Sequence, residues 1–243
     1  MNEIKDRVCL VTGANRGIGL AIVESFLHHG SAKIYAGVRS MDKAAELVSR
    51  HGDAIAPLVI DYNQPETIQA AAKAAADVEI VVSNAGLLNQ TRVTDENVID
   101  SFQEELEVNV YALLRMARAF APVLRANGGG AFVQVNSIAS LASFDDFATY
   151  CASKAAAYSF TQSLRRSFAG QNTALLSVHP GPIETDMARQ AGMAGQGEAA
   201  EVVSEAIVES LKKGEFHLFP DKFAQLFGGA YRRFAEDIIE AEE

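Results

Sequence analysis

Short apolar runs alternate with longer amphipathic segments along almost the whole chain. Runs of four to seven residues, rich in branched side chains and bounded by glycine or polar residues, are typical of buried strands; they cover 7–12, 33–38, 54–60, 79–83, 131–135, 173–178 and 216–219. The segments between them show helical spacing of apolar positions, ending at His29 and then covering 42–50, 66–76, 95–126, 149–168, 198–213 and 222–240. This alternation predicts an α/β fold with a parallel sheet.

Composition narrows the class of protein. The 243 residues are 49% hydrophobic and 21% charged, which is enough to bury a large core, so we expect one domain spanning 1–243. A formal net charge of −10 argues against a nucleic-acid partner and against an anionic membrane surface. Cys9 and Cys151 form no disulfide or metal pattern, and the N-terminus lacks a signal-peptide pattern, so we expect a cytoplasmic protein with no membrane span.

A glycine-rich segment, T-G-A-N-R-G-I-G at 12–19, separates the first predicted strand from the first predicted helix. Glycine lets the backbone approach a phosphate closely, and the free N–H groups of a following helix N-terminus face the negative charge. A glycine loop can also be a plain turn. Its place between strand and helix favours cofactor binding by Gly13, Asn15, Arg16, Gly17, Ile18 and Gly19.

A second polar constellation surrounds the predicted helix 149–168. Tyr150 and Lys154 are four residues apart, so their side chains share one helix face. A cation there should lower the pKa of the phenol, which could then exchange a proton with an alcohol or carbonyl oxygen. Ser137, just beyond the strand 131–135, could donate a second hydrogen bond to that oxygen. Tyr-x-x-x-Lys alone is a weak motif, but the serine and the glycine loop strengthen it.

Together these motifs resemble those of the short-chain dehydrogenase/reductase family over nearly the full chain. The loop spacing G-x-x-x-G-x-G is the variant that this family carries, and Ser137, Tyr150 and Lys154 match its active site. The resemblance implies a Rossmann-type doubly wound sheet of seven mostly parallel strands, in the order 3-2-1-4-5-6-7, with helices on both faces. The cofactor should then lie across the carboxyl ends of the strands, between strands one and four.

The resemblance also implies roles for residues elsewhere in the chain. Asn109 would hold a water against the catalytic lysine, although an asparagine within a helix is usually just exposed. Asp61 would contact the adenine amino group, with a helix N-cap as the alternative. Further cofactor contacts are expected from Asn84, Ala85, Gly86, Pro180, Gly181, Ile183 and Thr185, with Tyr150 and Lys154 also contacting it; Ser83 stands where the family usually has asparagine.

Two arginines bear on the choice of cofactor. An acidic residue about twenty positions after the glycine loop would select NAD, but the second strand ends in Val38 and Arg39. Arg16 and Arg39 can grip a 2′-phosphate with forked hydrogen bonds, so we expect NADP(H). The alternative is that both are ordinary surface arginines. His179 is interpreted as a packing residue rather than an acid or base.

These observations predict an NADP(H)-dependent oxidoreductase that interconverts a ketone or aldehyde and the corresponding alcohol. A flap at about 183–198 should cover a small neutral substrate in a mostly apolar pocket, with polar contacts available from Asn89 and Gln90. Two alternatives stay open: a 3-oxoacyl thioester reductase, with Arg115, Arg118 and Arg125 as a docking patch, and a non-catalytic NADP-binding sensor. The family resemblance suggests a homodimer or homotetramer.

Overall fold

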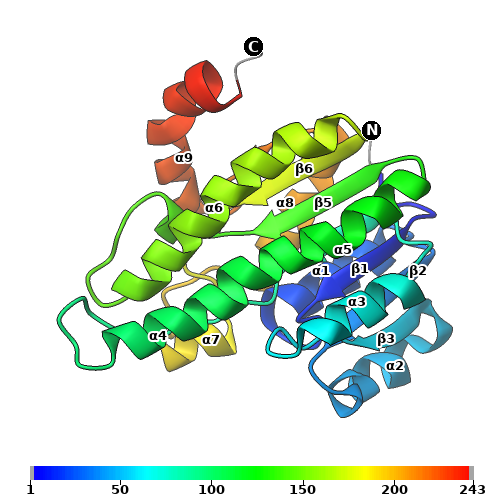
Figure 1. The fold of residues 1–243 in the computed structure, drawn as a ribbon, viewed down its shortest axis with the longest axis horizontal. Coiled ribbons are helices and arrows are strands. Elements are labelled where there is room, and N and C mark those ends of the chain that lie inside the picture. The colour runs from blue at the N-terminus through cyan, green and yellow to red at the C-terminus, as the bar shows by residue number, and fades with distance from the viewer. Residues whose placement is uncertain (1–2, 241–243) are drawn as a thin grey trace.

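A seven-stranded parallel sheet forms the centre of the computed structural model, which describes residues 3–240 (Figure 1). Its order, β3-β2-β1-β4-β5-β6-β7, confirms the predicted topology. The strands are β1 Val8–Thr12, β2 Lys33–Val38, β3 Ile55–Val59, β4 Ile80–Ser83, β5 Gly130–Val135, β6 Thr173–Val178 and β7 His217–Leu218.

Helices connect the strands and cover both faces of the sheet. The α-helices are α1 Gly17–His28, α2 Ala45–His51, α3 Pro65–Ala74, α4 Val98–Glu105, α5 Ala112–Ala126, α6 Ala148–Ala169, α7 Asp186–Gln190, α8 Ala200–Lys213 and α9 Lys222–Phe234. Short 3₁₀ turns cover Met41–Ala44, Gly52–Ala54 and Ile138–Ser140, and π-helical turns cover Leu106–Tyr111 and Ala235–Ile239. No helix among the described residues is long and apolar enough to cross a bilayer.

Each central strand buries side chains on both faces, because successive residues of a strand point to opposite sides. In β1, Cys9 and Val11 pack with α1 and α8, whereas Leu10 packs with α3, α5 and α6. The same alternation recurs in β4 and β5. Figure 1 shows α5 and α6 across one face of the sheet, with α1 and α8 behind it. The continuous apolar runs of the sequence therefore reflect a sheet that is buried from both sides.

Several predicted elements differ in detail from the structure. The helical stretch expected at 95–126 begins only at Val98 and contains the π-helical turn Leu106–Tyr111 between α4 and α5. The last strand, expected at 216–219, is reduced to His217–Leu218. The wider π turn changes which side chains of this helix point inward, and this matters for the site described below.

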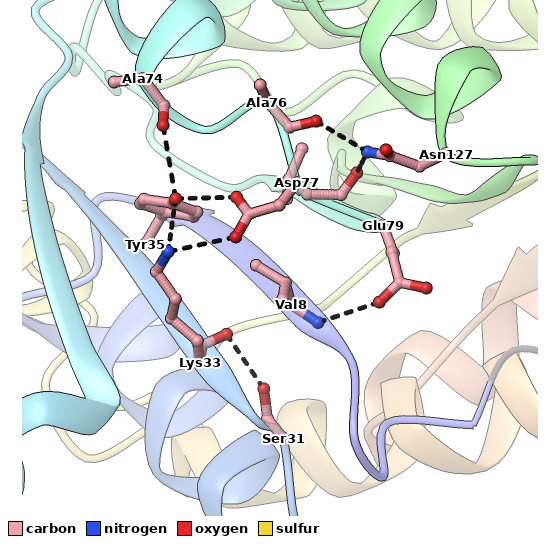
Figure 2. Close-up of polar contacts among 10 residues, drawn as sticks. Val8, Ser31, Lys33, Tyr35, Ala74, Ala76, Asp77, Glu79 and Asn127 are labelled. Atoms are coloured by element: carbon pink, nitrogen blue, oxygen red, sulfur yellow. Dashed lines mark hydrogen bonds and ion pairs between the residues drawn. The ribbon is translucent and has the colours of Figure 1, made fainter.

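Polar contacts join the strands at their amino ends, the edge of the sheet opposite the candidate site (Figure 2). Lys33 Nζ donates to the Tyr35 hydroxyl at 2.5 Å and to Asp77 Oδ2 at 3.2 Å, and the same hydroxyl donates to Asp77 Oδ1 at 2.7 Å. Asn127 Nδ2 donates to the carbonyls of residues 76 and 78 at 3.0 and 2.9 Å. These contacts connect the start of β2 and the end of α5 to the segment that precedes β4. They lie at the amino ends of the strands, away from the carboxyl ends, where the candidate site lies.

Candidate active site

The predicted catalytic side chains meet at the carboxyl edge of the sheet, where β5 ends and α6 begins. Beyond Val135 the chain turns outward, and the Ile138 N–H donates to the Pro180 carbonyl at 3.0 Å, which joins this loop to the loop after β6. The Ser137 hydroxyl accepts the Ala139 N–H at 3.1 Å and so caps the short turn Ile138–Ser140. Ser137 is thereby held at the start of α6.

Tyr150 lies in the first turn of α6, and its ionisation differs from the expectation. Burial raises the pKa of the phenol above its ordinary value, and a hydrogen bond with the Ser137 side chain only partly offsets this by lowering it. The expectation that Lys154 lowers the pKa of Tyr150 is not met in this structure. The phenol is therefore protonated at neutral pH, the state in which it can donate a proton to a carbonyl oxygen.

Lys154 lies one helical turn beyond Tyr150 and is almost completely buried. Its Nζ donates to the Val135 carbonyl at 3.0 Å and stands 5.8 Å from the centroid of the Tyr150 ring. Burial lowers the pKa of Lys154 to about 8, because the desolvated ammonium loses its hydration, and the Glu105 carboxylate opposes this fall. The cation is close to the phenol, but its one hydrogen bond among the described residues is to a backbone carbonyl.

Asn109 is buried rather than exposed, and the π-helical turn directs it toward the site. Its Nδ2 donates to the Leu87 carbonyl and to Ser153 Oγ, and its Oδ1 accepts the Leu87 N–H, each at 2.9 Å. A methyl group added at Gly86 would lie 3.2 Å from Asn109 Oδ1 and 3.6 Å from Lys154 Nζ. Asn109 and Lys154 thus border the same glycine, and a residue with a side chain there would separate them.

The glycine loop forms a cradle at the N-terminus of α1. Gly13 has a φ of +64° and Gly17 a φ of +53°, and a Cβ on Gly19 would lie 2.1 Å from the Gly13 carbonyl oxygen. No side chain caps the first N–H groups of α1, and its N-cap residue, Arg16, has extended backbone angles. A close backbone turn that ends in an uncapped helix N-terminus fits a phosphate group. Asn15 and Ile18 lie within the same cradle.

Thr12 fixes the Asn84-Ala85-Gly86 turn against this cradle. Its hydroxyl accepts the N–H groups of Asn84 and Ala85 at 2.9 and 3.1 Å and the Tyr62 hydroxyl at 2.9 Å. Asn84 Nδ2 returns a hydrogen bond to the Thr12 carbonyl at 2.9 Å. The carboxyl ends of β1 and β4 are thereby held together at the point where the strand order reverses.

The residues expected at the adenosine end surround the ends of β2 and β3. Arg39 follows β2 and is exposed. Arg16 Nη1 lies 3.9 Å from Asp186 Oδ2 in α7. Asp61 does not cap α3, whose N-cap is Gln64; its carboxylate accepts the Asn63 N–H at 3.0 Å and Gln64 Nε2 at 3.2 Å. The cradle and the two guanidiniums therefore fit a dinucleotide with an added phosphate.

The loop after β6 passes close to the cradle. The Gly181 N–H donates to Asp221 Oδ2 at 2.7 Å, and a methyl group added at Gly17 would lie 3.1 Å from Thr185 Cγ2. Thr185 also caps α7 by accepting the Ala188 N–H. The Glu184 N–H donates to the Glu198 carbonyl at 2.9 Å, beside a bridge between Ile183 and Glu198, so the two ends of segment 183–198 are joined. Pro180 and Ile183 lie at the start of this loop.

His179 is a packing residue in this structure. It is fully buried, and its two ring nitrogens lie 2.9 Å from Ser140 Oγ and 2.7 Å from Ser177 Oγ. Burial, and to a lesser degree the neighbouring His217, lower its pKa to about 3. A neutral imidazole with both nitrogens hydrogen-bonded to hydroxyls supports the loops behind Ser137.

Comparison with known proteins places this geometry in a family. A sequence profile of the family described as short chain dehydrogenase matches residues 7–195. The chain belongs to the short-chain dehydrogenase family. The protein is accordingly an oxidoreductase of this family, and its seven-stranded sheet is the sheet of a Rossmann-type short-chain dehydrogenase.

Three relatives illustrate the range of similarity within the family. The 3-oxoacyl-[acyl-carrier-protein] reductase FabG of Vibrio cholerae is 32% identical over 196 residues, covering 77% of this chain and 78% of that protein. An NADP-dependent 3-hydroxy acid dehydrogenase of Schizosaccharomyces pombe is 29% identical over 76% of this chain and 75% of that one. A short chain dehydrogenase from Burkholderia cenocepacia, crystallised with NADP, has 31% identity and a TM-score of 0.88, covering 99% and 100% of the two chains.

Sequence reasoning missed several side chains that this short-chain dehydrogenase places at the site. Thr12 and Ser153 were not singled out, although both hold predicted site residues in place. Glu105 was missed as well: it is fully buried four residues before Asn109. Its spacing of four residues from Asn109 suggests a shared helix face, but this spacing does not distinguish a buried carboxylate from a solvated one. The rest of the signal, burial of a carboxylate, was not visible in the sequence.

Proposed function

We propose that this protein interconverts a ketone or aldehyde and the corresponding alcohol by hydride transfer with NADP(H), with Tyr150 as the general acid and base. The observation that carries the proposal is that Tyr150 lies against the Ser137 side chain and 5.8 Å from Lys154 Nζ, which itself borders Gly86 at the strand end next to the glycine cradle. A proton donor and a buried cation there suit an oxygen that gains or loses a proton.

The four proposed catalytic residues have distinct roles. Bound NADP(H) would supply the hydride chemistry. In the reducing direction, Tyr150 donates its phenolic proton to the substrate oxygen, and Ser137 Oγ donates a hydrogen bond that polarises it. Lys154, whose Nζ lies 5.8 Å from the centroid of the Tyr150 ring, would hold the ribose next to the nicotinamide. Asn109 bounds the lysine and connects it toward solvent.

The NADP(H) preference rests on charge at the adenosine end. Arg39 stands where an NAD-selecting carboxylate would be, and Arg16, the N-cap residue of α1, is the second arginine that we assign to the 2′-phosphate. The Burkholderia cenocepacia relative was crystallised with NADP, and the Schizosaccharomyces pombe relative is named as NADP-dependent. Arg16 Nη1 lies 3.9 Å from Asp186 Oδ2. In this proposal the 2′-phosphate therefore competes with the Asp186 carboxylate for the Arg16 guanidinium.

Substrate recognition is assigned to an apolar surface near Ser137 and to the segment 183–198 as a flap. Leu87, Leu88, Phe144 and Pro182 are partly exposed there, whereas Ile138 and Ala139 are buried behind them. Asn89 and Gln90, expected as polar contacts, border a polar cavity of about 300 Å³ shared with α4. The flap ends are joined near Ile183 and Glu198, so it can move as one loop.

A 3-oxoacyl thioester substrate is the second candidate, favoured by the similarity to FabG of Vibrio cholerae. The basic surface expected to bind an acyl carrier has less free positive charge than expected, because Arg115 forms an ion pair with Glu107. Arg118 and Arg125 remain exposed on α5. We therefore keep a neutral ketone or aldehyde as the proposed substrate and include 3-oxoacyl thioesters in the assay described next.

The test follows the reduced-nicotinamide absorbance with a panel of neutral ketones, aldehydes and 3-oxoacyl thioesters of increasing chain length. We expect turnover of neutral carbonyl compounds with NADPH, at a higher kcat/KM than with NADH. Turnover confined to thioesters would replace the substrate class. NADPH binding without turnover of any compound would favour the sensor alternative.

The cofactor arm uses Arg39→Asp. This change should weaken NADPH far more than NADH, because it removes a phosphate-binding guanidinium and adds a carboxylate that can bind ribose hydroxyls. Arg118→Asp, at an exposed arginine of α5, is the control for the charge change itself. Equal affinities for the two cofactors in the unchanged protein would refute the preference.

A further inference from the structure

Glu105 is a buried carboxylate that the proposed reaction does not use. It is the last residue of α4 and has no exposed surface. Its Oε1 accepts the Asn89 N–H at 2.7 Å. Its Oε2 is buried and has no hydrogen bond among the described residues, and the same holds for the hydroxyl of Thr149, the residue before Tyr150. A buried carboxylate with a free oxygen is costly, so its retention needs a compensating partner.

The groups around Glu105 identify that partner. Burial raises the pKa of Glu105, whereas the Asn89 N–H, the Thr149 hydroxyl and Lys154 lower it, and Glu104 on its own helix raises it. From α6, Tyr150 and Cys151 are the other titratable groups that feel its charge. Lys154 is the one cation among these groups. Asn109, four residues beyond Glu105, and Lys154 Nζ both border Gly86, so the ammonium lies on the side of the site where α4 ends and is the charge that can compensate the carboxylate.

The Glu105 carboxylate in turn affects the pKa of Lys154. Burial lowers the pKa of Lys154 to about 8, and the Glu105 carboxylate is the group that raises it. Tyr150 and His179 are the other ionisable side chains near Lys154, and both are neutral at pH 7, so neither adds a charge beside the ammonium. Without Glu105, the lysine would be a desolvated ammonium held by one backbone carbonyl.

We propose that Glu105 is a positioning residue that keeps Lys154 mainly in its charged form at neutral pH, and so sets the pH range in which Tyr150 can work. The first part concerns only the folded protein. The second part rests on the proposed function, because it concerns turnover. The two parts therefore have separate readouts.

The first readout needs no substrate. In protein carrying ¹³C-labelled lysine and glutamate, the ¹³Cε signal of Lys154 and the ¹³Cδ signal of Glu105 are titrated by NMR. We expect Glu105 to be ionised at pH 7 in the unchanged protein. In Glu105→Gln, which keeps an oxygen for the Asn89 N–H, the Lys154 midpoint should move to lower pH by on the order of one unit.

The matched control is Glu104→Gln, the same change one residue earlier on the exposed side of α4. It should leave the Lys154 midpoint in place, because solvent screens that carboxylate. A protonated Glu105 at pH 7, measured without any substitution, would overturn the proposal even if Glu105→Gln failed to fold. An unmoved Lys154 midpoint in folded Glu105→Gln would overturn it as well.

The second readout is the pH profile of kcat/KM for carbonyl reduction. Loss of the carboxylate lowers the pKa of both Lys154 and Tyr150, so the alkaline limb should move to lower pH in Glu105→Gln and return toward its original place in Glu105→Asp. A merely structural role would lower the rate without moving the limb. If the NMR midpoint moves and no protein variant turns over a carbonyl compound, the proposed function fails while the charge pairing stands.

Discussion

At the scale of single residues, burial outweighs the neighbouring charge at the proposed catalytic pair. The spacing of Tyr150 and Lys154 placed them correctly on one helix face, but it gave no measure of desolvation. Burial raises the pKa of Tyr150 and lowers that of Lys154, so both groups are displaced toward their neutral forms. A phenol in this state is prepared to donate a proton, which suits carbonyl reduction.

His179 gives a prediction about stability against acid. Its pKa is lowered from 6.5 to about 3, so below pH 6.5 the unfolded chain takes up a proton that the native chain excludes. The free energy of unfolding should therefore fall as pH drops, by about 1.4 kcal/mol for each pH unit from this residue. His179→Asn should be less stable at pH 7, by roughly 1–3 kcal/mol, and lose less on acidification.

Urea unfolding at pH 7, 6 and 5 measures this difference. His28→Asn, at an exposed histidine of α1, is the control and should keep the original pH dependence. The same pH dependence in His179→Asn as in the unchanged protein would show that His179 does not carry the effect.

Sequence reasoning reached the site residues whose role depends on local spacing. The glycine loop, Ser137, Tyr150 and Lys154 could all be placed because each lies at the end of a strand or in the first turns of a helix. Glu105 could not be found in this way, because a glutamate four residues before Asn109 reads as an ordinary solvated position. The role that we propose for Glu105 depends on Lys154, which lies on a different helix, α6.

At the scale of elements, the π-helical turn is the feature that periodicity could not predict. A pattern of apolar positions at helical spacing fits α4 and α5 equally well with or without an inserted residue, so 95–126 was expected as one uniform helix. The turn at Leu106–Tyr111 brings Asn109 to the site in buried form. The ends of strands were within a residue or two of the prediction, because glycine and polar residues mark them.

Thr12 gives the prediction at this scale, because it joins the ends of β1 and β4. Thr12→Val keeps the shape but leaves the N–H groups of Asn84 and Ala85 and the Tyr62 hydroxyl without their acceptor. Each stranded group costs about 1–3 kcal/mol when buried, so stability should fall clearly and NADPH binding should weaken. Urea unfolding and cofactor titration measure the two effects.

Thr12→Ser is the matched control, since it keeps the hydroxyl and removes only a methyl group. It should remain close to the unchanged protein in both measurements. If Thr12→Val were as stable as Thr12→Ser, the hydroxyl could not be what holds the two strand ends together.

At the scale of the whole molecule, the alternation of strands and helices predicted a parallel sheet, whereas the order of its strands was expected from the family resemblance. What the sequence could not give was the arrangement of the loops after β5 and β6, which meet through the Ile138–Pro180 hydrogen bond. Such contacts join residues far apart in the chain, and no local pattern records them. The function depends on them, since they bring Ser137 to Tyr150.

Self-association is predicted at this scale. Ile99 and Tyr111, in the helical stretch from α4 to α5, are 62% and 46% exposed, and Phe160 of α6 is 40% exposed. Apolar surface of this kind favours pairing between copies. Sedimentation should therefore show a species of two or four chains, and a single species of 26.0 kDa would contradict this.

The central claim is that the Tyr150 phenol exchanges the proton during carbonyl reduction. The direct test compares the unchanged protein with Tyr150→Phe, using NADPH, the best carbonyl substrate of the panel, and a separate titration of NADPH binding. We predict that Tyr150→Phe binds NADPH with little change and loses at least about a hundredfold in kcat, since general acid catalysis contributes about 10²–10⁴-fold. Equal rates in the two proteins would contradict the account.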